Sequence, residues 1–180
     1  MRIIGGIYKN RRIDFNNLDI RPTTNFAKES LFNILNNHYD LETKSILDLF
    51  AGSGSISYEF ASRGCKEIIA VDNNIKCINC IKKIIDKLKI KNLIAQLANV
   101  NSFIKYINSS HDIIFLDPPY NYTQEQYDQI IRNILQKNIL NKYGMIIIEH
   151  SRFIKFENYP DFLNMKKYGR VHFSFLKNEK

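Results

Sequence analysis

Five short apolar runs recur along the chain and restrict its fold more than any other feature. They occupy residues 45–50, 67–72, 92–97, 112–117 and 145–149. Each run has the length of a buried strand, and the segments between them are longer and mostly show helical periodicity. Such alternation is typical of βα units around a mostly parallel sheet. The sequence therefore predicts an α/β fold in which the carboxyl ends of these strands share one edge of the sheet.

Two of the intervening segments carry clear apolar stripes. Ile and Leu residues recur at helical spacing in 75–88, and Tyr127 begins a similar stripe that continues to Leu135. We interpret both stripes as helix faces that pack against the sheet. A further helical stretch is predicted over 56–63.

The two ends of the chain are predicted to form hairpins. Near the carboxyl end, β-like runs at 164–168 and 171–176 flank Gly169, which predicts an antiparallel hairpin at the sheet edge. Near the amino end, the short runs 2–7 and 11–15 predict a basic β-hairpin arm.

A helix is predicted to follow the arm, with a Thr as its N-cap. The residues expected to share one face of this helix, with His38 as a packing residue, are Ala27, Leu31, Ile34, Leu35 and His38. No low-complexity linker interrupts the sequence. We therefore expect residues 1–44, the hairpin and helix, to form one unit with the domain at 45–180.

The charge of the chain favours a polyanionic partner. The net charge is +8, from 26 Lys and Arg against 18 Asp and Glu, which is typical of nucleic-acid binding, although a general preference for Lys accounts for part of it. No apolar run reaches the roughly 18 residues that a membrane span needs, and no signal peptide is recognised. We expect a cytoplasmic monomer.

The cysteines argue against a disulfide or metal framework. There are three, Cys65, Cys77 and Cys80, and an odd number without an export signal does not suggest structural disulfides. The Cys77-x-x-Cys80 pair lies in a helical segment without a second pair or a His at matching spacing. We interpret these residues as buried or idle thiols and predict no metal site.

A glycine-rich loop follows the first of the five apolar runs. Gly52 and Gly54 lie between that strand and a helix, where the backbone can approach a ligand and the helix N-terminus attracts negative charge. Asp48 lies inside the strand, and Asp72 closes the next strand at the distance of a ribose-binding acid. Ser57 stands where dinucleotide-binding proteins have a third glycine. The pattern therefore favours S-adenosylmethionine, whose ammonium group Asp48 can help to hold directly or through water.

Asn99 follows the third strand, where a polar side chain can meet the adenine amine; the alternative is an ordinary loop Asn, and both interpretations stay open. The complete predicted cofactor-binding set is Thr24, Asp48, Phe50, Ala51, Gly52, Ser53, Gly54, Asp72, Asn73, Asn99 and Val100.

The motif Asp117-Pro118-Pro119-Tyr120 ends the fourth strand and is the predicted catalytic site. An exocyclic base amine is a poor nucleophile because its lone pair is delocalised into the ring. Asp117 and the Pro118 carbonyl can accept its two hydrogens and localise that lone pair, while Tyr120 stacks on the base. Pro118 and Pro119 keep this backbone rigid.

Asp-Pro-Pro-Tyr after a glycine loop resembles the amino-methyltransferases. Longer matches resemble the RsmD family, the bacterial 16S rRNA guanine-N2 methyltransferases: they are Arg2-Ile3-Ile4-Gly5-Gly6, Arg21-Pro22-Thr23-Thr24, and the segments 47–54 and 112–120. The resemblance implies a Rossmann-like class I methyltransferase, S-adenosylmethionine as donor, and 16S rRNA of the small ribosomal subunit as substrate, at guanine 966. Four positions depart from the family pattern: Asn25, Phe26, Lys28 and Ala70.

The predicted RNA-binding residues are the cations of the amino-terminal segment, Arg2, Lys9, Arg11, Arg12 and Arg21. Four of these five are Arg in a chain with 18 Lys and 8 Arg, and the planar guanidinium suits phosphate and guanine. The alternative is a solvated hairpin.

The sequence also admits other functions. Glu149-His150 resembles an acid–base pair, but we interpret it as strand-end solvation or as support for the site, because methyl transfer needs no strong base. A DNA adenine-N6 or cytosine-N4 amino-methyltransferase would use the same Asp-Pro-Pro-Tyr chemistry but usually carries an extra target-recognition region. The non-enzymatic alternative is an RNA-binding module.

Overall fold

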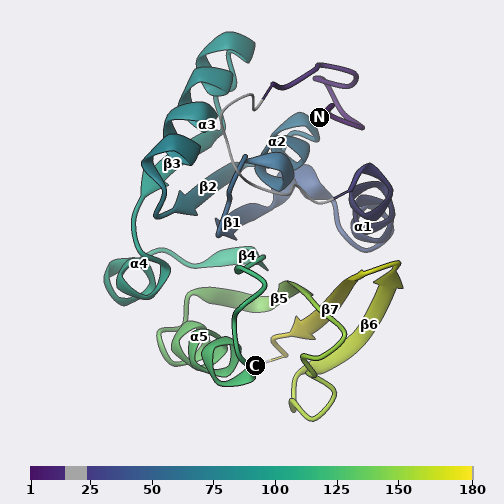
Figure 1. Ribbon diagram of the computed structural model, residues 1–180, viewed down its shortest axis with the longest axis vertical. Helices are drawn as coiled ribbons and strands as arrows, with labels where there is room; N and C mark the ends of the chain where they lie inside the picture. The colour runs from purple at the N-terminus through teal and green to yellow at the C-terminus, as the bar shows by residue number, and fades with distance from the viewer. Residues whose placement is uncertain (15–23, 180) are drawn as a thin grey trace.

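A sheet of seven strands forms the centre of the fold in the order β3-β2-β1-β4-β5-β7-β6 (Figure 1). The computed structural model describes residues 1–14 and 24–179. The first five strands are parallel, and β7 runs antiparallel between β5 and β6. The strands are β1 (Ser45–Leu49), β2 (Glu67–Asp72), β3 (Leu93–Leu97), β4 (His111–Leu116), β5 (Leu140–His150), β6 (Phe162–Tyr168) and β7 (Val171–Lys177). The predicted α/β fold with a C-terminal antiparallel hairpin is confirmed.

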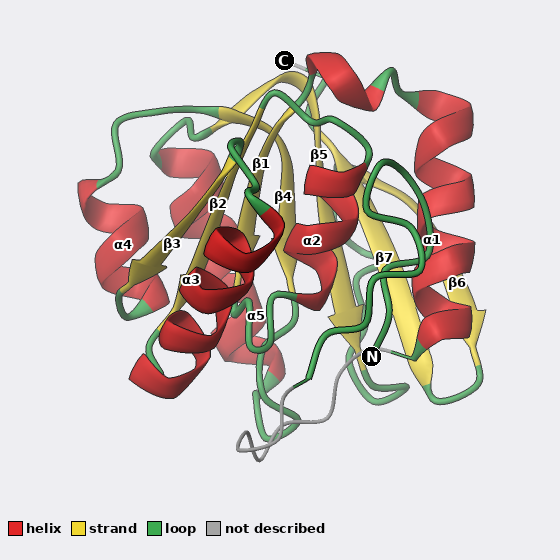
Figure 2. Cartoon of the chain, turned by 90° about the horizontal axis from the view of Figure 1, so that it is seen from above, coloured by secondary structure: helices red, strands yellow, loops and turns green. Residues whose placement is uncertain are grey.

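Helices cover both faces of the sheet (Figure 2). They are α1 (Asn25–His38), α2 (Ser55–Ser62), α3 (Ile75–Leu88), α4 (Val100–Tyr106) and α5 (Gln124–Gln136), with a short 3-10 turn, η1 (Leu41–Thr43). One apolar cluster packs α1, α2 and α3 against the sheet, and a second packs α4 and α5 against the other face. Because alternate residues of the central strands enter different clusters, as Ile46 and Leu47 do, these strands are apolar at most positions.

The predicted boundaries agree with the structure where the element is apolar over its whole length. They disagree where part of the element is polar. The helix over 75–88 is as predicted, whereas β5 begins at Leu140, five residues before the apolar run. Its first residues pair with β4 beyond a bulge, through backbone contacts that leave no apolar pattern. Helix α4 was missed because it has only seven residues. His38 is exposed, so its predicted packing role is wrong: the buried stripe of α1 ends at Leu35.

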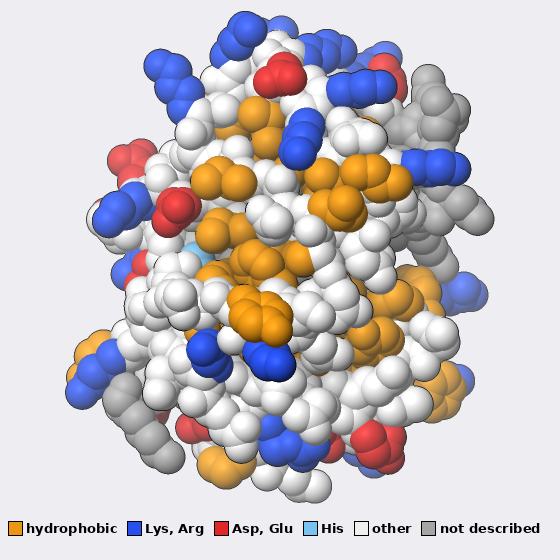
Figure 3. Space-filling model, turned by 90° about the vertical axis from the view of Figure 1, so that its left-hand side faces the viewer, with side chains coloured by type: hydrophobic (Ala, Val, Ile, Leu, Met, Phe, Trp, Pro, Cys, Tyr) orange, Lys and Arg blue, Asp and Glu red, His pale blue; other side chains and the backbone are white. Residues whose placement is uncertain are grey.

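Strand β3 and helix α4 form the edge of the molecule opposite the hairpin. They expose Ile94, Leu97 and Tyr106. Hydrophobic side chains lie among Lys and Arg on this side (Figure 3). No helix in the described ranges 1–14 and 24–179 is long and apolar enough to cross a membrane.

The amino-terminal arm, residues 1–14, folds back on itself and docks on α2. Its two limbs meet in a single antiparallel bridge between Arg2 and Arg12, so the predicted hairpin forms without regular strands. The N–H groups of Ile7 and Tyr8 donate to the carbonyl and hydroxyl oxygens of Ser62, at 2.7 and 2.9 Å. A Cβ atom on Gly6, which has φ +74°, would lie 1.8 Å from the Ser62 carbonyl oxygen. Only glycine permits this contact.

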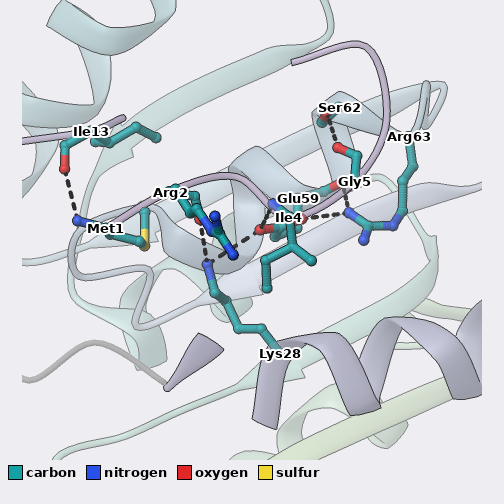
Figure 4. Close-up of polar contacts among 9 residues, drawn as sticks. All are labelled: Met1, Arg2, Ile4, Gly5, Ile13, Lys28, Glu59, Ser62 and Arg63. Atoms are coloured by element: carbon teal, nitrogen blue, oxygen red, sulfur yellow. Dashed lines mark hydrogen bonds and ion pairs between the residues drawn. The ribbon is translucent and has the colours of Figure 1, made fainter. Parts of the chain in front are cut away.

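A buried ion network joins the arm to α1 and α2 (Figure 4). The Glu59 carboxylate accepts hydrogen bonds from Lys28 Nζ at 3.2 Å, from Arg63 Nη1 at 2.6 Å and from the Ile4 N–H at 2.9 Å. Lys28 Nζ also donates to the Arg2 carbonyl oxygen at 3.3 Å. The side chains of Lys28 and Glu59 are 0% exposed, and this burial lowers the pKa of Lys28. Lys28, one of the departures from the family pattern, therefore has a structural role here.

The three cysteines are free thiols. Burial raises the pKa of Cys65 to about 12 and that of Cys77 to about 11, so neither is a thiolate at neutral pH. No cluster of three or more His, Cys, Asp or Glu side chains within 1–14 and 24–179 is arranged to hold a metal ion.

Candidate active site

The predicted polar residues lie at the carboxyl ends of adjacent parallel strands. The glycine loop follows β1, Asp72 ends β2, and Asn99 lies two residues after β3. Asp117 follows β4, and Glu149 lies near the end of β5. The strand order reverses between β1 and β4, and ligands of open α/β sheets bind beside such a switch point.

The glycine loop has a backbone shape that depends on positive φ angles. Phe50, Gly52 and Gly54 have φ of 65°, 52° and 77°. A Cβ atom on Gly54 would lie 2.8 Å from the Tyr58 ring and 3.0 Å from Ile81. Gly54 is also the N-cap of α2 and provides no side-chain cap, so the helix N-terminus stays open to a ligand.

Asp72 holds this loop in place. Its carboxylate accepts the Gly52 N–H at 2.8 Å and the Asn74 N–H at 2.8 Å, one on each oxygen. A carboxylate oxygen has two lone pairs, so both can still accept a hydroxyl hydrogen bond. Asn73 is exposed beside it. Asp72 thus combines a structural role that the sequence did not predict with a position suited to ribose.

Asp48 lies buried beneath the loop. Ser57 Oγ donates a hydrogen bond to its carboxylate, so the residue at the missing third glycine has its own role. Burial raises the pKa of Asp48 to about 7, with a further contribution from Asp72, although the Ser57 hydrogen bond opposes the shift. This burial favours an indirect contact with a ligand ammonium, through water, over a direct one.

Two hydroxyl groups beside the glycine loop indicate that a polar cofactor fits there. Ser55 Oγ and Tyr58 Oη, in the first turn of α2, are buried and have no hydrogen-bond partner within the described part of the chain. Unsatisfied buried hydroxyls are costly, and a polar ligand beside the loop can satisfy them. The site formed by Ala51, Gly52, Ser53 and Asp72 therefore fits a nucleoside cofactor.

Two members of the predicted cofactor set cap helices. Asn99 Oδ1 accepts the N–H groups of Asn101 and Ser102 at 3.0 and 3.3 Å and begins α4, whose first residue, Val100, is buried. Neither interpretation of Asn99 anticipated this role. Thr24 Oγ1 accepts the Ala27 N–H at 3.2 Å, which confirms that a Thr caps α1.

A pocket surrounds the Asp-Pro-Pro-Tyr motif. Its lining includes Asp117, Pro118, Tyr120, Glu149 and Arg170. Leu116 pairs with Ile148 in register, which places Asp117 beside Glu149. Burial and then the Glu149 charge raise the pKa of Asp117 well above its usual range. Tyr120 is 73% exposed, in a position to meet a ligand.

Aromatic rings connect the glycine loop to this pocket, a feature that the sequence pattern did not reveal. Phe50 contacts Tyr122 edge to face at 5.4 Å, and Tyr122 contacts Tyr127 at 6.0 Å. Tyr127 in turn contacts Phe156 at 5.6 Å and donates to the Glu149 carbonyl oxygen. The helical stripe had assigned Tyr127 to packing alone. The loops after β1 and β4 thus share a rigid wall.

Glu149 and His150 are buried, so the strand-end solvation considered for them is wrong. His150 makes 2.8 Å hydrogen bonds with the Ser151 carbonyl oxygen and with Ser174 Oγ of β7, and burial lowers its pKa. These contacts leave His150 as a neutral support of the pocket wall. Glu149 instead places a negative charge beside Asp117, which raises the pKa of Asp117.

The predicted RNA-binding residues lie away from this pocket. Arg2, Lys9, Arg11 and Arg12 are exposed on the arm, and Arg21 lies outside the described residues. Arg11 and Arg12, with Tyr8, face Lys87 and Leu88 across a groove between the arm and α3. The arm contacts the last turn of α2, about 10 Å along that helix from the glycine loop at 1.5 Å per residue.

The sheet order, the glycine loop after β1 and the Asp-Pro-Pro-Tyr pocket after β4 define a Rossmann-like class I methyltransferase. The putative methyltransferase yhhF from Escherichia coli has the same fold, with a TM-score of 0.87 and 25% identity, over 99% of this chain and 98% of that one. The chain matches the family described as "Conserved hypothetical protein 95" over residues 1–177 and belongs to it. This match, together with relatives named as small-subunit rRNA methyltransferase D, confirms the resemblance to the RsmD family.

Two relatives show how far the similarity extends. The "Ribosomal RNA small subunit methyltransferase D" of Buchnera aphidicola is 36% identical over 183 residues, which cover 99% of this chain and 92% of the relative. The protein of the same name from Haemophilus influenzae is 32% identical over 186 residues, covering 99% and 94%.

Proposed function

We propose that this protein transfers a methyl group from S-adenosylmethionine to the exocyclic N2 amine of a guanine in 16S rRNA of the small ribosomal subunit, at guanine 966. One observation carries the proposal: Asp117 and Tyr120 line a pocket that the ring of Phe50 connects to the glycine loop. A base amine in the pocket would then lie beside a donor held by the loop.

The residues of the pocket position and polarise the amine. The Asp117 carboxylate and the Pro118 carbonyl accept its two hydrogens, which raises the electron density on nitrogen. Tyr120 stacks on the base, and Asp72 accepts the ribose hydroxyls of the donor. When bound, S-adenosylmethionine supplies the methyl group. The ionised Asp117 carboxylate accepts more strongly than the neutral acid and balances the positive charge that develops on nitrogen, so its raised pKa predicts activity that increases with pH through that pKa.

The names of the relatives and the charge of the arm support RNA as the substrate. Both relatives are named as small-subunit rRNA methyltransferases. Arg2, Lys9, Arg11 and Arg12 supply exposed cations for phosphate. A DNA amino-methyltransferase remains the alternative, because it would place its own target amine against Asp117 in the same way.

The direct test uses small ribosomal subunits from cells that lack this activity. Incubation with labelled S-adenosylmethionine should label 16S rRNA, and mass spectrometry of the digested RNA should identify N2-methylguanosine at position 966. Label on adenine or cytosine, or label on DNA in place of the subunits, would contradict the proposal. Binding of the subunits without any methyl transfer would favour the RNA-binding module.

The arm gives a separate prediction about substrate binding. Replacing both Arg11 and Arg12 by Ala should weaken binding to the small subunit and lower the slope of log affinity against log salt by about one unit per lost phosphate contact. Affinity for S-adenosylmethionine should not change. Titrations across a salt series measure both effects. A matched control replaces Lys137, which follows α5, and Lys142 of β5, which are both exposed cations. Equal slopes for both double variants would show that the arm is structural.

A further inference from the structure

The outer edge of the catalytic pocket is formed by the loop after β5 and by the turn between β6 and β7. Ser151, Ile154, Arg170 and Val171 line the pocket there. Arg152 and Phe153 lie between two of these lining residues, and Tyr168 pairs with Val171 in the hairpin. The residues next to these lining residues therefore lie near the outer edge of the pocket.

These neighbouring side chains are aromatic rings and cations, all of them exposed except Tyr168, which is half-buried. Phe153 is 75% exposed, and the Arg152 guanidinium lies 4.9 Å from the centroid of its ring. Phe26, at the start of α1, is 67% exposed and contacts Tyr168 edge to face at 5.8 Å. We call Phe26, Arg152, Phe153, Tyr168 and Arg170 the rim.

The loop after β5 and the hairpin turn carry charge of one sign. The segments 151–155 and 166–172 carry five Lys and Arg residues and no Asp or Glu: the cations are Arg152, Lys155, Lys166, Lys167 and Arg170. Exposed rings among cations, beside a pocket, combine the two features by which proteins hold unpaired nucleic acid, since rings stack on bases and guanidinium groups contact phosphate.

We propose that the rim binds the unpaired nucleotides that flank the target base in the RNA, a role that rests on the proposed function. Base faces are accessible to rings only where the bases are not stacked in a duplex, so the substrate segment must be single-stranded where it crosses the rim. The rim is a second RNA-binding surface, separate from the arm, and it directs the target base towards Asp117.

The test compares Phe153→Ala with Tyr106→Ala in methylation of small ribosomal subunits. Tyr106 is a matched control because it is 72% exposed, has Lys105 at 5.3 Å from its ring and belongs to α4, across the molecule from the hairpin (Figure 1). Loss of one stacked base should raise the KM for the subunit by about 5- to 150-fold in Phe153→Ala. The kcat at saturating RNA and the KM for S-adenosylmethionine should match the parent.

Further variants separate stacking from general apolar contact. Phe153→Tyr should keep the parental KM, whereas Phe153→Leu should raise the KM as Phe153→Ala does. In a separate assay, an unpaired RNA should compete with the subunit for the enzyme better than the same RNA annealed to its complement. A parental KM in Phe153→Leu would overturn the proposal in favour of a protein partner. Equal KM values for Phe153→Ala and Tyr106→Ala would also overturn it. A parent enzyme that does not methylate the subunit would instead contradict the proposed function.

Discussion

Asp117→Ala is expected to lower kcat for methyl transfer by about 10²- to 10³-fold, the range seen when one preorganised electrostatic contact is removed. The variant should keep the fold and the affinity for S-adenosylmethionine, because the carboxylate belongs to the Asp-Pro-Pro-Tyr pocket and Asp72 holds the glycine loop. Single-turnover rates with saturating RNA and donor isolate this effect. A rate close to that of the parent would rule out amine activation by Asp117.

The pH dependence provides the control for this role. The activity of the parent should rise as pH increases through the raised pKa of Asp117, since the ionised carboxylate is the stronger acceptor for the amine. Glu149→Gln removes the neighbouring negative charge that contributes to this shift, and so should move the acid limb of the profile to lower pH. An acid limb at the same pH in both proteins would show that Asp117 is not the titrating group.

Glu59→Ala is expected to lower the free energy of unfolding by about 3–5 kcal/mol, the range for breaking a buried ion pair. The change leaves Lys28 buried without its counter-charge and also removes the acceptor for Arg63 and for the Ile4 N–H. Urea denaturation followed by circular dichroism measures the loss.

Two further variants serve as a control and as a rescue for Glu59→Ala. Glu29→Ala removes an exposed acid from the same helix that carries Lys28 and should change the free energy by less than about 0.5 kcal/mol. Adding Lys28→Met to Glu59→Ala should recover part of the loss, because no buried ammonium then remains. A loss below about 1 kcal/mol in Glu59→Ala would show that water replaces the missing carboxylate.

Local sequence patterns were sufficient for the sheet and for much of the site. The continuous apolar runs predicted β1, β2 and β4 because strands covered on both faces are apolar at most positions. The same pattern predicted β3, although this edge strand exposes Ile94 and Leu97. The stripe in 75–88 predicted α3, and Gly169 predicted the hairpin. Since carboxyl ends of parallel strands share one edge, the positions of Gly52, Asp72 and Asp117 on one edge followed from the strand assignment.

Contacts between distant segments were decided only by the tertiary structure. Asp117 and Glu149 are 32 positions apart in sequence and become neighbours through the pairing of β4 with β5. Lys28 and Glu59 form an ion pair because α1 packs beside α2, and a lone charged residue in a helix predicts exposure. Phe26 and Tyr168 are even further apart in the sequence, and their rings are in contact. Strands and helices follow from local periodicity, whereas the partner of a side chain depends on how whole elements pack.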